Sequence, residues 1–237
     1  MKKVMLWGDG PHLELYDLAY CFLDGVDALT VNAPLSGEYT DLVITEPFQL
    51  TPDRIREIRD SGFRGTVMAE KPAARSPQAL KQILDALDGC SVYLVHTRLF
   101  APPLPLPDAG EVVIDWPNRY ATGMDPLWNT LPNAADALYV CNGGQMPALA
   151  DAGRRGDGLC FLFQLRERKV TLRITPGDEG QKVSVSGASL QWPNAFDTLQ
   201  AAWQAAHGAN PEASHAHELL SIRLSAAACE LLQRERK

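Results

Sequence analysis

The sequence predicts an α/β protein in which a parallel-sheet domain precedes an α+β domain with an antiparallel sheet. Three observations lead to this prediction. The first 95 residues alternate short apolar runs with helical patterns, a proline-rich segment follows at 101–110, and closely spaced apolar runs come after it. Strands that alternate with helices form parallel sheets, whereas consecutive strands joined by short turns form antiparallel ones. We expect the two domains to cover residues 1–98 and 99–237.

Five short apolar runs in the first domain are expected to be buried strands, because each is too short for a helix. They cover residues 3–8, 28–33, 41–47, 65–70 and 91–96. Thr51-Pro52 and Ser76-Pro77 each place a capping side chain before a proline, which favours a helix that starts there. Gly62 and Gly89 are expected to end those two helices.

The connection between the second and third runs is unusually short. Only seven residues, 34–40, separate the two strands. A parallel crossover needs a dozen or more residues, normally with a helix. Either these two strands pair antiparallel, or a helix-strand unit of the ancestral sheet has been removed.

The second domain begins after a segment with four prolines in ten residues, which is expected to be an extended connector. The later apolar runs predict strands over 111–117, 158–167, 169–176 and 182–192. Helical patterns cover 131–141, 195–207 and 211–235. Because residues 160–165, Cys-Phe-Leu-Phe-Gln-Leu, are apolar on both faces, we predict a homo-oligomer that forms through this sheet.

Composition and charge exclude several classes of protein. The chain is 46% hydrophobic and 22% charged, which is ordinary for a globular protein, and its net charge of −7 argues against nucleic acid and anionic membranes as partners. No apolar segment approaches the roughly 18 residues of a membrane span, and no signal peptide is evident. Five cysteines without a Cys-x-x-Cys pair favour reduced thiols and a cytoplasmic protein. His215 and His217 are two apart, so they form a poor metal pair on a helix.

Glu70-Lys71-Pro72 follows the fourth expected strand. In open parallel sheets, ligands bind beyond the carboxyl ends of the strands. An ammonium group at such a place can stabilise negative charge on a substrate oxygen. Lys71 is therefore either an active-site cation or a solvated turn residue beside Glu70.

This order of elements resembles the Gfo/Idh/MocA family of NAD(P)-dependent oxidoreductases. The resemblance rests on residues 41–100, with a strand that ends in Thr-Glu-Pro, a helix, a strand that ends in Glu-Lys-Pro, a second helix, and the segment Val-His-Thr-Arg-Leu-Phe. It implies a truncated Rossmann-like domain that binds NAD or NADP. It also implies a second domain that contacts a small-molecule substrate and forms the oligomer interface.

The resemblance assigns roles to individual residues. It places Lys71 near the nicotinamide and the reacting carbon, and it makes Pro72 the residue that turns the chain across the strand ends. The implied cofactor-binding residues are Gly8, Gly10, Asn32, Pro47, Glu70 and Pro72. The implied catalytic positions are Lys71, Asn129 and Asn133.

The first domain departs from the family pattern at the cofactor. The turn 8–13, Gly-Asp-Gly-Pro-His-Leu, keeps two glycines of the dinucleotide fingerprint but has Leu13 in place of the third. Asp9 places a negative charge where phosphate would lie. Asn32 replaces the acid that holds the ribose in relatives. Phe48 and Thr51 replace an asparagine and a histidine after the third strand.

The second domain departs from the pattern at the proton-transfer pair. Asn129 and Asn133 replace the Asp and His of relatives, and asparagine is neither an acid nor a base. Asp125 and Asp136 are nearby carboxylates, each expected to cap a helix or to form a salt bridge. The aromatic residues Trp116, Tyr120 and Trp128 either line a cleft of sugar size or belong to the core or an interface.

Two functions follow from these residues. The first is an oxidoreductase that transfers a hydride between NAD(P) and a small sugar-like or carbonyl substrate. The alternative is a non-catalytic descendant that acts as a binding or partner subunit after losing the cofactor. A third reading, in which the same cleft serves another cofactor or reaction, also stays open.

Overall fold

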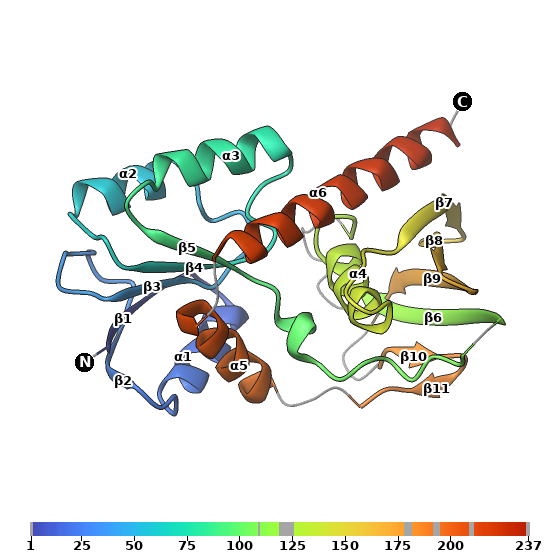
Figure 1. Cartoon of the computed structure of the whole chain (residues 1–237), viewed down its shortest axis with the longest axis horizontal. Helices are drawn as coiled ribbons and strands as arrows, with labels where there is room; N and C mark the ends of the chain where they lie inside the picture. Colours follow the sequence, from blue (N-terminus) through green and yellow to red (C-terminus); the bar gives the residue numbers. More distant parts are fainter. Residues whose placement is uncertain are drawn as a thin grey trace. The chain divides into compact units, whose positions relative to one another are not determined.

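The structure is a computed structural model that describes residues 2–108, 110–118, 126–177, 182–191, 195–208 and 211–235 (Figure 1). The chain forms two compact units, Met1–Thr97 with Asn194–Leu219, and Arg98–Pro193 with Leu220–Lys237. The first unit contains a parallel sheet, and the second contains a mixed sheet with helices. The predicted fold class is therefore confirmed.

The first sheet has five parallel strands in the order β2-β1-β3-β4-β5. Their bounds are Lys2–Trp7 (β1), Val26–Val31 (β2), Asp41–Ile44 (β3), Thr66–Glu70 (β4) and Ser91–Val95 (β5). The central strands are apolar on both faces, as parallel sheets covered by helices require. Leu6, Leu42 and Val67, for example, are fully buried.

The short connection 32–40 leads from one side of β1 to the other. Both β2 and β3 pair with β1 in parallel, so the antiparallel alternative is wrong. A doubly wound sheet has the strand order 3-2-1-4-5-6. Removing its edge strand 3 and renumbering the others gives the observed order. The order therefore agrees with a shortened sheet, in which β2 is an edge strand with exposed side chains.

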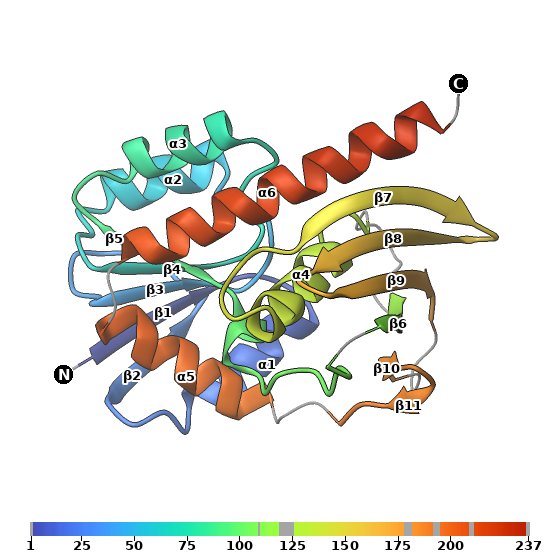
Figure 2. The same cartoon turned by 45° about the vertical axis from the view of Figure 1, so that its right-hand side comes forward.

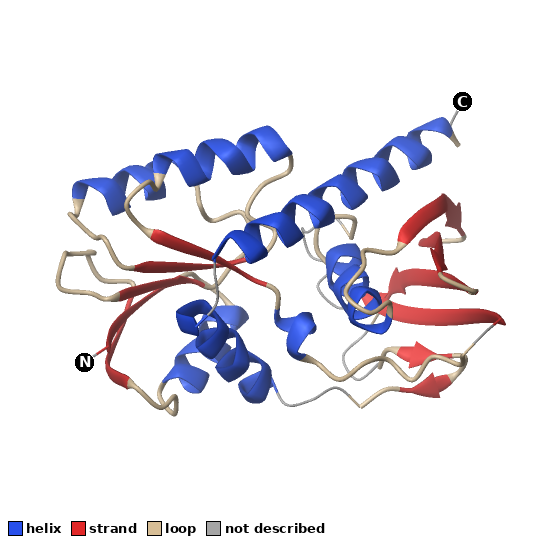
Figure 3. Ribbon diagram, in the orientation of Figure 1, coloured by secondary structure: helices blue, strands red, loops and turns tan. Residues whose placement is uncertain are grey.

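Helices cover both faces of the first sheet. The helices α2 (Pro52–Asp60) and α3 (Pro77–Ala86) lie on one face, and α1 (Pro11–Tyr20) and α5 (Ala195–Gly208) lie on the other (Figure 3). The predicted caps are present, because the Thr51 side chain accepts a hydrogen bond from Arg54 N and the Ser76 side chain accepts one from Ala79 N.

The segment Asn194–Leu219 belongs to the first unit, although it follows the second sheet in the sequence. Nε2 of His207 on α5 lies 2.6 Å from Oδ1 of the fully buried Asp41. At the start of α6 (Pro211–Arg234), the Ser214 hydroxyl accepts a hydrogen bond from Leu94 N at 3.2 Å. Side chains from the end of the chain thus fix two helices against β3 and β5.

The second sheet has the order β11-β10-β6-β9-β8-β7 (Figure 2). Its elements are β6 (Gly110–Asn118), β7 (Ala148–Arg155), β8 (Gly158–Leu165), β9 (Arg168–Pro176), β10 (Ser184–Val185), β11 (Ala188–Ser189) and the helix α4 (Thr130–Cys141). A short 3-10 helix, Thr97–Phe100, precedes them. Strands β6 and β9 pair in parallel, so the sheet is mixed and not wholly antiparallel as expected. In β8, Phe161, Phe163 and Leu165 are buried, while the residues between them form a less buried face.

None of the helices in the described part of the chain has the length and apolar character of a bilayer-crossing segment. All five cysteines are free thiols.

Gly65, just before β4, provides a test of the sheet packing. A Cβ atom at this position would lie 2.0 Å from the backbone oxygen of Thr40, which cannot rotate away. We expect Gly65→Ala to lower the free energy of unfolding by about 2 kcal/mol or more, as measured by urea denaturation. Gly208→Ala is the control, because none of the described residues beyond its own helix and its chain neighbours places an atom within 4 Å of the added Cβ. Equal stability of the two variants would contradict the packing described.

Candidate cofactor and catalytic site

Five residues lie at the carboxyl edge of the first sheet, because each directly follows a parallel strand. In spatial order across the sheet they are Asn32, Gly8, Thr45, Lys71 and His96. This edge is where open α/β sheets bind ligands. The predicted residues Gly8, Asn32 and Lys71 thus share one edge, and Thr45 and His96 are additions that the tertiary structure supplies.

The turn at Gly8 and Gly10 joins β1 to α1 and passes close to β3. A Cβ atom at Gly8 would lie 2.0 Å from Thr45 Oγ1, so the close approach of β1 and β3 requires glycine there. Gly10, with φ of +90°, is the N-cap of α1 and provides no capping side chain. The first N–H groups of a helix lack partners within the helix and attract anions.

Asn32 fixes this turn from the end of β2. Its Oδ1 accepts a hydrogen bond from Gly8 N at 3.1 Å, and its Nδ2 donates one to Gly8 O at 2.7 Å. Its φ of 48° lies in the left-handed region, which asparagine tolerates better than most residues. The side chain predicted to contact the cofactor therefore binds the backbone of the glycine turn.

Glu46, which the sequence did not single out, lies beside the same turn. Its Oε1 is 3.8 Å from the position that a Cβ of Gly10 would occupy, and its Oε2 is 3.6 Å from Nδ1 of His12. The Glu46 side chain is 20% exposed. Burial raises the pKa of Glu46, the nearby His12 opposes that shift, and Asp9 adds to it. The neighbouring Pro47, predicted to bind the cofactor, is buried.

Lys71 lies at the end of β4 and is only 3% exposed. It is therefore not the solvated turn residue of the second interpretation. The Lys71–Pro72 peptide bond is cis. Phe48 N donates a hydrogen bond to Pro72 O at 2.9 Å, and Ala73 N donates one to Oε1 of Glu218 at 2.8 Å. Two elements thus hold the turn that carries Lys71.

Glu70, predicted as a cofactor-binding residue, contacts α1. Its carboxylate accepts a hydrogen bond from the hydroxyl of Tyr16. Burial raises the pKa of Glu70, and the Tyr16 hydrogen bond together with the positive charge of Lys71 opposes that shift. The pKa of Tyr16 is raised by burial and by Glu70. The pair therefore links β4 to α1 inside the first unit.

His96 and Glu218 form a buried pair that sequence reasoning missed. His96 follows β5 and is 1% exposed, and its Nε2 lies 3.2 Å from Oε2 of the fully buried Glu218. The ring of His217 meets that of His96 edge-on, with centroids 4.6 Å apart, whereas Nε2 of His215 lies 2.7 Å from Val92 O. The two histidines of α6 contact different residues, as their spacing predicted. The position of His96 directly after a strand was the available signal.

The predicted pair Asn129 and Asn133 lies in the second unit, at the start of α4. Asn129 precedes the helix without a side-chain cap, and Nδ2 of Asn133 donates to Asn129 O at 3.0 Å. Asp136, one turn on, is fully buried. Trp116 and Trp128 are buried at 6% and 8% exposure, as core aromatics are. Tyr120 and Asp125 lie outside the described residues.

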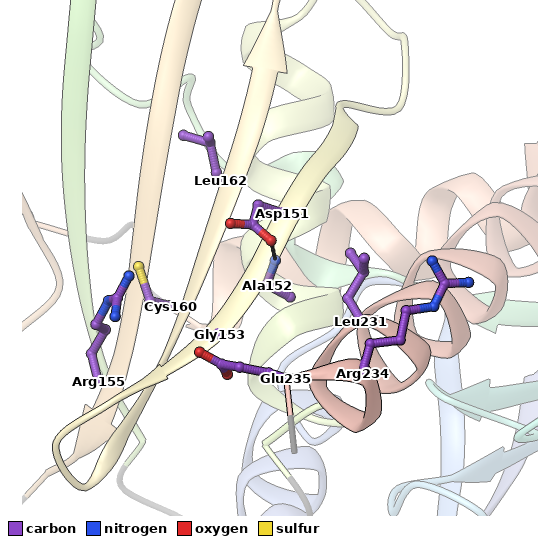
Figure 4. Close-up of a pocket in the computed structure, with 9 residues that line it drawn as sticks. All are labelled: Asp151, Ala152, Gly153, Arg155, Cys160, Leu162, Leu231, Arg234 and Glu235. Atoms are coloured by element: carbon purple, nitrogen blue, oxygen red, sulfur yellow. Dashed lines mark hydrogen bonds between the residues drawn. The ribbon is translucent and has the colours of Figure 1, made fainter. Parts of the chain in front are cut away.

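A cavity of about 330 Å³ lies in the second unit beside β7, β8 and the end of α6 (Figure 4). Its charged lining includes Asp151, Arg155 and Arg234. Oε2 of Glu235 accepts a hydrogen bond from Arg154 N at 2.8 Å. This N–H group of the edge strand β7 is therefore not available to pair with another strand. None of the predicted site residues lines this cavity.

Comparisons with solved structures identify oxidoreductases with the same fold. The WlbA dehydrogenase from Thermus thermophilus, in complex with NAD and UDP-GlcNAcA, matches with a TM-score of 0.66 and 16% identity over 95% of this chain and 94% of that one. A myo-inositol dehydrogenase from Corynebacterium glutamicum matches with a TM-score of 0.69 and 12% identity over 99% and 97%. GenD2 from gentamicin A biosynthesis, in complex with NAD, matches with a TM-score of 0.72 and 12% identity over 99% and 95%.

These neighbours are oxidoreductases of the Gfo/Idh/MocA type, so the resemblance found in the sequence is supported at the level of the fold. A scan against protein-family models and a search of curated proteins gave no match. The glycine turn keeps one feature of a dinucleotide site, because Gly10 starts α1 at the carboxyl edge without a side-chain cap, although Gly8 N already donates a hydrogen bond to Asn32. The charge of the turn is unfavourable for an anion, because Asp9 lies in the turn and Glu46 lies beside it.

Asn32 provides a test of the turn. Asn32→Asp keeps an acceptor for Gly8 N but places a carboxylate oxygen against Gly8 O, while both residues tolerate positive φ. We expect a loss of about 1–2 kcal/mol in the free energy of unfolding at neutral pH, measured by urea denaturation. Gln82→Glu, the same amide-to-acid change at an exposed position of α3, is the control. A loss no larger than that of the control would contradict the assigned hydrogen bonds.

Proposed function

We propose that the protein is an NAD(P)-dependent oxidoreductase that acts on a small sugar-like or other hydroxyl- or carbonyl-containing substrate. The observation that carries the proposal is Lys71, a cation that is 3% exposed at the carboxyl edge of the sheet. The fold supports it, because the chain shares that fold over 95% or more of its length with dehydrogenases described in complex with NAD.

Lys71 is the residue of this chain that would act on the substrate in the proposed reaction. When bound, NAD(P) supplies or accepts a hydride. The ammonium group of Lys71 would donate a hydrogen bond to the substrate oxygen and stabilise negative charge as it develops there. A site removed from water strengthens this interaction, because the effective dielectric constant falls with burial.

The neighbours of Lys71 act as positioning groups. The hydrogen bonds from Phe48 N to Pro72 O and from Ala73 N to Glu218 hold the residues directly after Lys71. An orienting shell of this kind matters, because an error of about 1 Å in a catalytic group lowers the rate by roughly a hundredfold. Asn129 and Asn133 would bind or orient a substrate and would transfer no proton.

Asn32, which follows β2, has no charged group that would distinguish NAD from NADP. An acid at this position would hold the ribose 2′-hydroxyl of NAD, and an arginine nearby would accommodate the 2′-phosphate of NADP. Asn32 instead binds both polar groups of Gly8. We therefore propose that both dinucleotides bind through the rest of the turn.

The non-catalytic alternative draws support from Glu46 and from the pair Asn129 and Asn133. It predicts a protein that binds neither dinucleotide. The experiment below separates the two functions.

Dinucleotide binding and the role of Lys71 can be tested in two consecutive steps. Millimolar NADH or NADPH is expected to raise the melting temperature, by mass action on the folded state. With a substrate found by screening polyols and sugar acids, Lys71→Met is expected to lower kcat by about a hundredfold or more. Its dinucleotide Kd, from calorimetry, is expected to stay within about twofold of the wild-type value, because Lys71 acts on the substrate oxygen.

Lys71→Arg is the control for charge, since it keeps the cation but not its shape. Unchanged melting temperature and tryptophan fluorescence in both dinucleotides would overturn the oxidoreductase proposal and favour the binding subunit. Full activity of Lys71→Met would overturn the role of Lys71 alone.

We also propose that the protein forms a homo-oligomer through the second sheet. The half-buried face of β8 carries Cys160 and Leu162. On the neighbouring strands, Arg173 of β9 forms an ion pair with Asp115 of β6. Sedimentation at micromolar concentration is expected to show a species heavier than one chain. Leu162→Glu is expected to dissociate it, because a charge at the centre of an interface loses its water. A wild-type protein that sediments as a single chain would contradict this proposal.

A further inference from the structure

Glu46 has an environment that its role in the fold does not explain. Its Oε1 is buried and accepts no hydrogen bond from the residues that the structure describes. A buried carboxylate oxygen without a hydrogen bond is unfavourable. Its pKa is raised accordingly. The position next to Gly10 and α1 is therefore one that the fold maintains at a cost in free energy.

The amino end of α1 lies beside this carboxylate. Helix amino termini carry a partial positive charge, and they favour carboxylates and phosphates alike. Pro11 at the start of α1 has no N–H group, and Gly10 provides no capping side chain. Glu46 is thus the anion that the fold itself places at this helix end, 3.8 Å from the Cβ position of Gly10.

We propose that Glu46 takes the place of pyrophosphate at the amino end of α1, and that a dinucleotide binds to the Gly8–Gly10 turn only after displacing or neutralising this carboxylate. The inference rests on the function proposed above. It makes Glu46 the residue that sets the affinity of the turn for phosphate-containing ligands.

His12 has the opposite role in this arrangement. Its Nδ1 lies 3.6 Å from Oε2 of Glu46, and in its protonated form it offsets the carboxylate charge. When phosphate replaces the carboxylate, His12 remains beside the incoming anion. Removing His12 therefore weakens anion binding, whereas removing the charge of Glu46 strengthens it. Two residues that only supported the fold would change binding in the same direction.

Calorimetric titration of the full chain with NADH, inorganic pyrophosphate and adenosine tests the proposal. Glu46→Gln is expected to tighten the binding of NADH and pyrophosphate by about tenfold or more, because a like charge a few ångströms away is removed. Adenosine, which has no phosphate, is expected to bind both proteins equally. His12→Gln is expected to weaken pyrophosphate binding by about threefold.

Glu14→Gln is the matched control, because it removes one carboxylate from the exposed side of the first turn of α1. Solvent screens that charge, so the Kd is expected to change by less than about twofold. Circular dichroism and melting temperatures verify that each variant is folded.

The outcomes separate the inference from the proposed function. If wild-type protein binds NADH and Glu46→Gln binds it no more tightly, the inference is overturned and the oxidoreductase proposal stands. If Glu46→Gln gains affinity for pyrophosphate but neither protein binds NADH or NADPH, the inference is supported and the oxidoreductase proposal is overturned. If no phosphate ligand binds either protein, both are overturned.

Discussion

The parallel pairing of β1 with both β2 and β3 is the constraint on which the rest of the structure depends. Together with the parallel pairing of β3 with β4 and of β4 with β5, it brings the carboxyl end of every strand in the first sheet to one edge, although only nine residues, 32–40, join β2 to β3. The close approach of β1 and β3 requires glycine at position 8, since Thr45 Oγ1 occupies the space of a side chain. The shape of the Gly8–Gly10 turn is thus a consequence of strand packing and needs no ligand to explain it.

Charge is distributed unevenly along this edge. Asp9 and Glu46 lie at the end of β1 and β3, whereas Lys71 and His96 follow β4 and β5. Relatives that bind a dinucleotide by the general rule need a phosphate-attracting turn on one side and a reactive site on the other. This chain has a buried cation at the end of β4 and carboxylates after the ends of β1 and β3. The function that we propose therefore depends more on Lys71 than on the glycine turn.

Residues remote in the sequence hold the ends of β4 and β5. Glu218 on α6 accepts from Ala73 N and lies beside His96, and Ser214 accepts from Leu94 N. The sequence predicts a helix over 211–235, assigns it to the second domain, and makes His215 and His217 a poor metal pair, but it does not indicate the buried roles of Ser214 and Glu218. These buried polar side chains were not predictable, because a glutamate on a helix is usually solvated and only its tertiary neighbours show that it is paired.

The sequence by itself determined the fold class, the five strands of the first sheet, and the two capped helices α2 and α3, because those features depend on local apolar periodicity and on side chains that bond to nearby backbone. It also placed Lys71 directly after the fourth strand, where the structure has it. Only the tertiary structure decided the direction of β2 and β3, the parallel pairing of β6 with β9, the binding of Asn32 to Gly8, and the position of Glu46. Strand pairing and burial join residues far apart along the chain, and no local pattern records which of them meet.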